Sequence, residues 1–509
     1  MAPNTLMEND LIDLSEVLQD HEKYATRKAL NSTPDTSIND EFSDESYSDD
    51  GIVIEDRMRL DKKKDIDRVV DSFQGSTREM KSLKSKHCVE VTNDNCIKAI
   101  NCVVQNYAWG RVGSSSLVAR LKKGASSSFQ ISTDSPYAEL WIGTHQKGMA
   151  ILENSNESLL EYVQSNPTRH LGDAKSLDLT YLLKVLSIKK VLSIQAHPNK
   201  KLAEQLHKNR PDVYKDSNHK PEMCVALTDD FEAMCGFLPI SELSSHLENY
   251  PEFAALIPER TRKAVFVAGS QNKNNASNVP ETREVLKALF RAYLEAPEDK
   301  MSFYLECLIK RLSTKEHLND VDRLMLKFSE QFHGDCGIFS PLLLNYMKLT
   351  KGESFFIGPD EPHAYIQGEI VECMACSDNV VRSGLTPKLK DVPTLVSMLT
   401  YDTRKPITTR GKQIDQYTRM YLPPVDDFAI EFVELPPNTE YKMRNVQSGS
   451  VLLTLTGNAK ILQGKSCIAN VDFGSCSFMS ANTLATVKSG AEGLHIVRAM
   501  SNSTAFSDI

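Results

Sequence analysis

Short stretches of alternating apolar and polar residues dominate the chain between about residues 97 and 236. In one of them, residues 191–197, the alternation places the apolar side chains on one face and the polar side chains on the other. Alternation with a period of two is typical of half-buried strands. Apart from one helix-like run at residues 200–208, we therefore expect this region to be mostly β.

Between about residues 238 and 336 the apolar residues follow a helical period instead. They form one stripe from Val285 to Leu294 and another from Val321 to Phe332. Stripes of this kind are typical of helices that bury one face. We interpret them as core faces of an all-α insert rather than as contacts to a cofactor.

The β pattern resumes after the helical region and continues beyond residue 403. Four strand-like runs there are separated by turn-forming residues, and they read FAIEFVEL, SVLLTLTG, CSFMSAN and LHIVRAM. Many short strands of this kind predict a sandwich or jelly roll. When the late β segment is laid on residues 352–363, Ala485 stands at the position of His363. We therefore interpret the late β region as a structural copy of the earlier one.

Composition sets the first 95 residues apart. Residues 1–56 hold 15 acidic and 3 basic side chains, a balance of −12 in a chain whose net charge is −9. Few aromatic and many small polar or acidic residues are typical of a disordered segment. We expect residues 1–95 to be a disordered acidic extension, the place where an unidentified partner would bind. The remainder stands at +3, which argues against a nucleic-acid surface.

Two further features exclude classes of protein. No apolar run reaches the ~18–20 residues that would span a bilayer, and acidic residues near the N-terminus argue against a secretory signal or a transit peptide. The 11 cysteines lack a framework spacing, which indicates reduced thiols and a cytoplasmic protein. Cys373 and Cys376 form the one close pair, and we interpret them as buried structural thiols rather than a redox or metal site.

Several potential metal ligands fall on the polar faces of the predicted strands. Gln195 and His197 share one face, Lys220 and Glu222 share a face of the strand predicted at residues 219–227, and His363 ends a third apolar strand. Two histidines, one carboxylate and a polar fourth group suffice for a divalent metal ion. On spacing alone, an ordinary hydrogen-bonded Gln-x-His pair remains the alternative.

Five segments resemble signature stretches of the type I mannose-6-phosphate isomerases, a family of cupin-fold zinc enzymes. They are residues 105–110 (QNYAWG), 138–145 (AELWIGTH), 194–200, 218–223 and 372–388, and they occur in the family's order between about residues 97 and 400. The resemblance implies a mainly β fold with an α insert: a cupin-type jelly-roll catalytic domain, a helical domain and a second, cupin-like β-sandwich domain. The predicted domains are residues 1–95 (extension), 96–237 with 337–402 (catalytic), 238–336 (helical) and 403–509 (C-terminal).

The resemblance also implies a function and a set of site residues. The reaction would be the interconversion of mannose 6-phosphate and fructose 6-phosphate through an enediol, which supplies mannose for GDP-mannose synthesis and glycosylation. One Zn²⁺ per chain would be held by Gln195, His197, Glu222 and His363, and the partner would be a small sugar phosphate bound by a monomer.

The acid and base groups are less sharply indicated. Lys220 is our first choice for the base, while Glu372, Asp378 and His219 stay open, and Arg382 matches a catalytic arginine of the family. Substrate contacts would come from Trp109, Lys184, Ser193 and Lys388.

Two other functions compete with the isomerase. A cupin fold also hosts iron-dependent oxygenases, because fold does not fix function. A protein without catalytic activity that senses a sugar phosphate through its acidic extension is the second alternative. The full set of potential ligands, together with Lys220 and Arg382, argues against a protein that has lost its activity.

Overall fold

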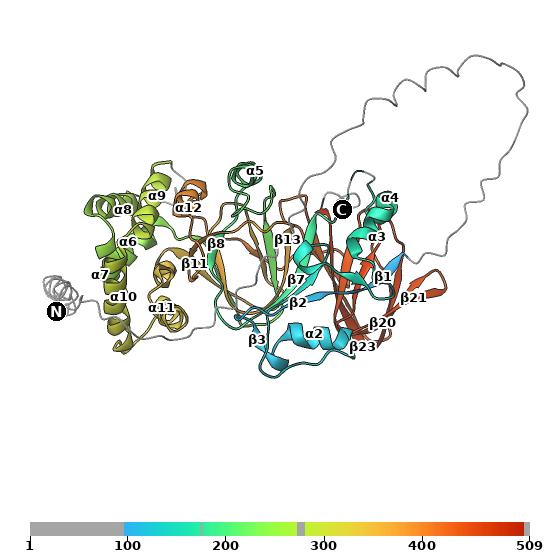
Figure 1. The fold of residues 1–509 in the computed structure, drawn as a ribbon. Helices are drawn as coiled ribbons and strands as arrows, with labels where there is room; N and C mark the ends of the chain where they lie inside the picture. Colours follow the sequence, from blue (N-terminus) through green and yellow to red (C-terminus); the bar gives the residue numbers. More distant parts are fainter. Residues whose placement is uncertain (1–95, 174, 176, 272–279, 503–509) are drawn as a thin grey trace, which may run out of the picture. The chain divides into compact units, whose positions relative to one another are not determined.

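The computed structural model describes residues 96–502, except residues 174, 176 and 272–279. The described chain is mainly β with a block of helices between strands, as the sequence predicts (Figure 1). The prediction for residues 1–95 lies outside the described residues. None of the described helices has the length and apolar composition needed to cross a membrane.

The first of two large sheets contains the strands on which the sequence placed the potential metal ligands. Its main path runs β15-β12-β9-β13-β7-β5-β2. Two branches start from the first part of β13: β10 pairs with β13 and β11, and β8 pairs with β13 and β14. Its eleven described strands are β2 (Val103–Gln105), β5 (Glu139–Ile142), β7 (Tyr181–Ile188), β8 (Ile194–Ala196), β9 (Glu222–Ala226), β10 (Phe231–Phe237), β11 (Leu344–Leu349), β12 (Ser354–Ile357), β13 (His363–Ala375), β14 (Val381–Gly384) and β15 (Thr408–Thr409).

The long strand β13 changes its partner halfway along. Its first residues pair with β10 and its later residues with β9, while β7 pairs with the half that starts at Gly368. Gly368 stands at the change with φ 111°, a conformation that favours glycine. A Cβ there would lie 2.7 Å from the Cα of Phe231. This bend lets one strand carry both His363 and Glu372 into the same sheet.

The predicted α insert is confirmed. Its helices are α6 (Ile240–Asn249), α7 (Pro251–Leu256), α8 (Glu259–Gln271), α9 (Pro280–Leu294), α10 (Glu298–Ser313) and α11 (Asp320–Gln331). Leu286, Leu289 and Phe290 of one predicted stripe, and Leu324 and Phe328 of the other, are buried. In Figure 1 these helices gather on the side of β11, away from β20 and β23.

The prediction of a single helix between residues 97 and 236 is wrong. Besides the expected α5 (Lys200–Asn209), this region contains α2 (Leu117–Ala125), α3 (Leu159–Ser165) and α4 (Pro167–His170). These helices are too short to show a clear period. Serine caps start two of them, Ser116 before α2 and Ser158 before α3, the latter in a capping box with Glu161.

The second large sheet is built mostly from the C-terminal region. Its ten described strands are β1 (Ile97–Asn101), β6 (Ile151–Leu152), β16 (Lys412–Gln413), β17 (Thr418–Tyr421), β18 (Ala429–Leu435), β19 (Glu440–Lys442), β20 (Ser450–Gln463), β21 (Ser466–Asp472), β22 (Cys476–Met479) and β23 (Thr486–Met500). The four predicted runs became β18, β20, β22 and β23. Strand β1, from the start of the described chain, pairs with β22 and so joins this sheet.

One apolar core joins the two sheets. Val185 of β7 and Val371 of β13 belong to the same buried cluster as Ile430, Val451 and Phe478 of the second sheet. Because neighbouring residues of a strand point to opposite faces, Lys184 and Glu372 point away from this core. A short pair, β3 (Arg111–Val112) with β4 (Pro136–Tyr137), and helix α12 (Val392–Met398) complete the elements.

The bend at Gly368 gives a testable prediction. Gly368→Ala should destabilise the protein by two effects, strain at a positive φ and a clash with the Phe231 backbone, each worth about 1–3 kcal/mol. Gly464→Ala is the matched control, because Gly464 has φ 60° and nothing within 4 Å of an added Cβ. Thermal denaturation followed by circular dichroism should show the larger loss for Gly368→Ala, and equal losses would contradict the role given to this bend.

Candidate metal centre and active-site pocket

A cavity of about 670 Å³ opens on the inner face of the first sheet, and most of the predicted site residues line it. They come from β7, β8, β9, β13 and β14 and from the segments next to these strands, except Trp109, which lies between β2 and β3. The predicted residues in its wall are Trp109, Lys184, Ser193, Gln195, Lys220, Glu222, Glu372, Asp378, Arg382 and Lys388. Both tryptophans of the chain, Trp109 and Trp141, lie there as well.

Three potential metal ligands converge at one side of this cavity. The ligand atoms of His197, Glu222 and His363 all lie within 4.8 Å of one another, and the described residues contain no second such group. The Nε2 atom of His197 is 3.3 Å from Glu222 Oε1, and Nε2 of His363 is 3.5 Å from Glu222 Oε2. All three side chains are buried.

The protein backbone fixes which nitrogen of each imidazole faces the centre. His197 Nδ1 lies 2.7 Å from the carbonyl oxygen of Asn379, and His363 Nδ1 lies 3.0 Å from that of Glu361. A carbonyl oxygen only accepts, so each Nδ1 carries the hydrogen and each Nε2 presents a lone pair. Metal-binding histidines are held in the same way.

The atoms that face the centre lack hydrogen-bond partners. Nε2 of His197, Nε2 of His363 and Oε2 of Glu222 are buried and unpaired. Buried polar atoms are nearly always paired, and a divalent cation would satisfy all three at once. These residues therefore fit a metal ion.

Gln195 lies beside this group in the sheet. On β8 it pairs with His363 across the sheet on one side and with Arg382 on the other. Its side chain lines the cavity, and its Oε1 accepts a hydrogen bond of 3.2 Å from Ser193 Oγ. Two imidazoles, a carboxylate and an amide oxygen form a mixed nitrogen and oxygen set that suits zinc.

Burial and charge keep these ligands in the forms that bind a metal. Burial, with the nearby charge of Lys220, lowers the pKa of His197 to about 4, so its imidazole is neutral near pH 7. Burial alone would raise the pKa of Glu222. The charge of Lys220, whose Nζ lies 3.2 Å from Oε1, outweighs burial, and the adjacent His197 and His363 add to its effect, so the pKa of Glu222 is held well below its usual range.

A second set of buried charges lies beside the metal ligands. Lys184 Nζ is 3.0 Å from Glu372 Oε2 and 3.6 Å from Glu139 Oε2, and Glu139 accepts the indole N–H of Trp141. Burial lowers the pKa of Lys184, but Glu372 and Glu139 outweigh burial and raise it above its ordinary value. Burial raises the pKa of Glu372, and Lys184 opposes that rise. Lys184 therefore stays charged between two carboxylates.

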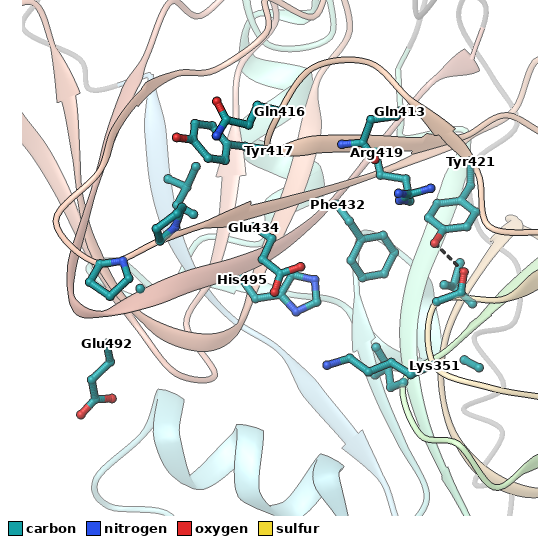
Figure 2. A pocket seen from close by; sticks show the side chains of 18 residues that line it. Lys351, Gln413, Gln416, Tyr417, Arg419, Tyr421, Phe432, Glu434, Glu492 and His495 are labelled. Atoms are coloured by element: carbon teal, nitrogen blue, oxygen red, sulfur yellow. Dashed lines mark hydrogen bonds between the residues drawn. The ribbon is translucent and has the colours of Figure 1, made fainter.

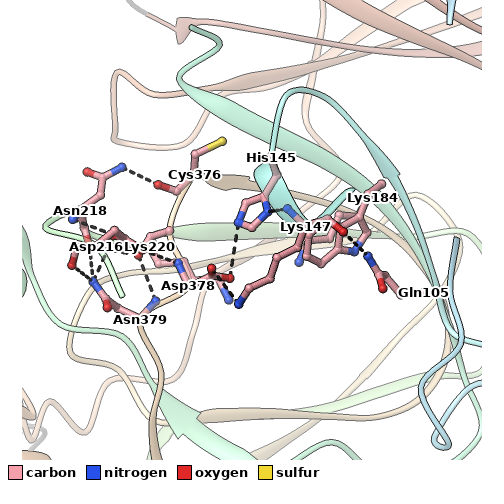
Figure 3. Close-up of polar contacts among 12 residues, drawn as sticks. Gln105, His145, Lys147, Lys184, Asp216, Asn218, Lys220, Cys376, Asp378 and Asn379 are labelled. Carbon is pink, nitrogen blue, oxygen red and sulfur yellow. Dashed lines mark hydrogen bonds and ion pairs between the residues drawn. The ribbon is translucent and has the colours of Figure 1, made fainter. Parts of the chain in front are cut away.

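Asp378 is the anion nearest the mouth of the cavity. Its carboxylate lies 3.4 Å from His145 Nε2 and 3.0 Å from Lys147 Nζ (Figure 3). The hydrogen bond from His145, followed by that from Lys147, holds the pKa of Asp378 well below its usual range. Asp378 is therefore a permanent anion near neutral pH.

Three cationic side chains lie around the same mouth: Lys147, Arg382 and Lys388. Burial lowers the pKa of Lys388, and the nearby charges of Arg382 and Lys147 lower it further. Burial lowers the pKa of Arg382 as well, and none of the ion pairs between described residues includes Arg382. A concentration of positive charge with an uncommitted guanidinium suits a phosphate or another small anion.

The structure does not bring His219 to the cavity. Strand β9 begins at Glu222, and the side chains of Lys220 and Glu222 both point inward. His219 therefore points the other way, and its Nε2 lies 3.1 Å from Asp427 Oδ2. The alternation that correctly grouped Lys220 with Glu222 already excluded His219 from the same face.

Sequence reasoning also missed residues that line the cavity. Glu139, Trp141 and His145 lie within the signature segment 138–145, and Lys147 follows it. Their place in that segment was the one available signal. Their partners, Lys184 and Asp378, are far away in the sequence, so no local pattern pairs them.

A second cavity of about 780 Å³ lies apart from this site (Figure 2). Strands β17, β18 and β23 line part of it. Its two basic residues, Lys351 and Arg419, balance its two acidic residues, Glu434 and Glu492. None of the predicted site residues lines it. The convergent charges and ligands therefore single out the first cavity, although it is the smaller of the two.

The buried charges lead to a stability prediction. Lys184→Met should lower the free energy of unfolding by about 3–5 kcal/mol, because it leaves Glu372 and Glu139 buried without their cation. Lys147→Met is the control, since the Lys147 side chain is 61% exposed and such a surface pair contributes about 0–1 kcal/mol. Thermal denaturation by circular dichroism compares the two, and a Lys184→Met variant as stable as the control would contradict the prediction.

Comparisons with known proteins agree with this geometry. The chain matches models of the phosphomannose isomerase type I catalytic domain at residues 97–240, helical insertion domain at 256–344 and C-terminal region at 420–466. It is 38% identical over 418 residues to mannose-6-phosphate isomerase 1 of Arabidopsis thaliana, covering 80% of this chain and 94% of the relative. It is 41% identical over 375 residues to mannose-6-phosphate isomerase of Homo sapiens, covering 70% and 87%.

Solved structures give the same result. A mutant of phosphomannose isomerase from Salmonella typhimurium matches with a TM-score of 0.68 and 30% identity, covering 80% of this chain and 100% of that one. A mannose 6-phosphate isomerase bound with zinc and yttrium matches with a TM-score of 0.67 and 29% identity, covering 80% and 99%. The chain therefore belongs to the type I phosphomannose isomerases.

Proposed function

We propose that this protein is a zinc-dependent isomerase that interconverts D-mannose 6-phosphate and D-fructose 6-phosphate. The observation that carries the proposal is the group of His197, Glu222 and His363, whose unpaired ligand atoms converge beside a cavity with a cationic mouth. The names of the relatives support an isomerase over the sugar-phosphate sensor and the iron-dependent oxygenase.

The metal would be held by Gln195, His197, Glu222 and His363. When bound, zinc supplies a Lewis acid that stabilises negative charge on a substrate oxygen. The neutral imidazoles, with their hydrogens directed at backbone carbonyls, leave only the Nε2 lone pairs to face it. A fixed ligand set of this kind needs no rearrangement during the reaction.

The cationic mouth would bind the phosphate. Lys388 and Lys147 supply charge where the cavity opens, and Arg382 adds a planar donor that suits either the phosphate or the negative charge that develops on the sugar. Trp109 and Ser193 also line the wall, where they would contact the sugar ring and its hydroxyls. Lys184 would act on the substrate indirectly, because it is buried between Glu139 and Glu372.

The isomerisation moves one proton from carbon 2 to carbon 1 of the sugar and a second proton from the oxygen on carbon 2 to the oxygen on carbon 1. We propose that Lys220 is the base. Its ammonium group pairs with Glu222 in this structure, and with Glu222 engaged by the metal ion it would act as a neutral amine that accepts the proton at Nζ from carbon 2 and returns it to carbon 1. Glu372 is the alternative, because it lines the same cavity and burial raises its pKa. Asp378 suits a hydroxyl contact better, since its pKa is held too low for it to carry a proton.

We further propose a cytoplasmic monomer built from the domains that the sequence predicts. Cys224, Cys235 and Cys373 are buried free thiols, as expected in a reducing compartment. The matched family regions support a catalytic domain of residues 96–237 with 337–402, a helical domain of 238–336 and a C-terminal domain of 403–509.

Removal of the metal tests reaction and cofactor together. Purified full-length protein should form fructose 6-phosphate from mannose 6-phosphate, lose this activity after treatment with a chelator and regain it when zinc is added. His197→Ala should lower zinc content and activity, whereas His317→Ala, at an exposed position in the helical region, should change neither. Folded, zinc-loaded protein without turnover would rule out the isomerase.

The base is tested by proton exchange rather than by turnover alone. Lys220→Met should lower kcat by about 10²–10⁴-fold and stop exchange of the carbon 2 proton with deuterated solvent, while metal analysis still finds one zinc per chain. Glu372→Gln is the comparison. Exchange that continues in Lys220→Met but stops in Glu372→Gln would assign the base to Glu372.

A further inference from the structure

Asp216 lies outside the signature segments, yet it is the most heavily bonded side chain around the metal site. It belongs to the loop between α5 and β9, four residues before Lys220. Its Oδ1 accepts hydrogen bonds from Ser377 Oγ at 2.8 Å, from the backbone N–H of Asn218 at 2.8 Å and from Asn379 Nδ2 at 3.2 Å. Its Oδ2 accepts the backbone N–H of Asp378 at 2.7 Å (Figure 3).

These bonds join the two segments that make up the site. One segment leads through Asp216 into Lys220 and the ligand Glu222. The other, residues 376–379, links Glu372 on β13 to Arg382 on β14. Asn218 adds a second link between them, because its Nδ2 donates to the carbonyl oxygen of Cys376 at 2.8 Å.

The clamped loop makes two contributions to the site. The carbonyl oxygen of Asn379 receives the Nδ1 hydrogen of His197 and so sets the orientation of that ligand. The next residue back, Asp378, points its carboxylate into the cavity. Asn379 is held in turn by Asp216, whose backbone oxygen accepts from Asn379 Nδ2 at 2.7 Å.

We propose that Asp216 is a positioning residue of the isomerase site, because it fixes loop 376–379. Through the Asn379 carbonyl it orients the ligand His197. Through the main chain of Asp378 it orients the carboxylate of that residue. The predicted effect on catalysis, through Asp378, rests on the proposed function. Its metal-binding part depends only on the geometry of the His197, Glu222 and His363 group.

A carboxylate is the side chain that this place requires. Four donors converge on its two oxygens, and an ionised carboxylate accepts on both oxygens without donating. An asparagine has the same size but only one accepting oxygen, because its other terminal atom is an NH2 group that donates. It must therefore lose the hydrogen bonds that one of the two carboxylate oxygens accepts. Hydrogen bonds to a charged acceptor are also about twice as strong as neutral ones.

Zinc affinity is the first readout, because a merely structural role would leave it unchanged in the folded protein. Asp216→Ala should weaken zinc binding by about 10–100-fold, the effect expected when the group that orients a metal-binding histidine is lost. Competition with a chromophoric chelator measures the dissociation constant on full-length protein. Asp212→Ala, an exposed residue of the same loop, is the matched control and should match the wild type.

A second readout follows the ligand geometry directly. With cobalt(II) in place of zinc, the visible absorption spectrum of Asp216→Asn should differ from that of the wild type, because His197 is no longer held by a fixed carbonyl. Asp216→Asn also keeps the test open if Asp216→Ala fails to fold, since it conserves volume. At saturating zinc, kcat/KM for mannose 6-phosphate should still be lower than in the control, which reports the displaced Asp378.

The outcomes separate the two proposals. Dissociation constants within twofold of the wild type and an unchanged cobalt spectrum in both Asp216 variants would overturn the positioning role, even if their thermal midpoints fall. Wild-type protein that binds zinc but shows no turnover would instead overturn the isomerase. The zinc and cobalt measurements would then still decide the role of Asp216 at the metal centre.

Discussion

The inner face of the first sheet has to hold five charged side chains that are more than nine-tenths buried. Glu139, Lys184, Lys220, Glu222 and Glu372 all lie there, three carboxylates and two ammonium groups. Isolated buried charges are very costly, so each must lie beside an opposite one, as Lys184 does between two carboxylates and Lys220 does beside Glu222. The set still carries one excess negative charge. A divalent ion would change the charge of this set from −1 to +1. It would thereby add to the positive charge of Lys147, Arg382 and Lys388 in the same cavity, which matches a phosphate ester with a charge of about −2 near neutral pH.

The need to keep these charges in place also gives the C-terminal region a physical role. Lys184 of β7 and Glu372 of β13 face the cavity, whereas their neighbours Val185 and Val371 face the second sheet. Packing of the apolar face against the second sheet therefore holds the strands that carry these charges in place. In the C-terminal region β22 is followed by β23, as β12 is followed by β13 in the first sheet. The residue that the sequence alignment lays on His363 is the buried Ala485, which offers no ligand atom to a metal.

The sequence predicted what a strand or helix period can encode. Alternation placed Lys220 and Glu222 on one face, and the helical stripes located the α insert. Contacts between distant segments leave no such mark: Asp216 and Ser377 are neighbours in space only because two loops meet, and Lys147 reaches Asp378 in the same way. His219 was a candidate because it lies in a signature segment, and its side chain does not line the cavity because neighbouring residues of a strand face opposite ways. The short helices α2 and α3 were missed since their serine caps are a weaker signal than a long apolar stripe.

The groups that orient the metal ligands explain why the conformation of a loop, and not of a strand, sets the geometry of the metal site. Both histidines direct Nδ1 at backbone carbonyls, of Asn379 and Glu361, rather than at side chains. A backbone carbonyl is present at every residue, so its direction depends on the local backbone conformation and not on the identity of the side chain. The carbonyl of Asn379 belongs to the segment between β13 and β14, where no strand pairing fixes the backbone. Side-chain hydrogen bonds must supply that order instead, and the carboxylate of Asp216 supplies more of them than any other group in contact with this segment.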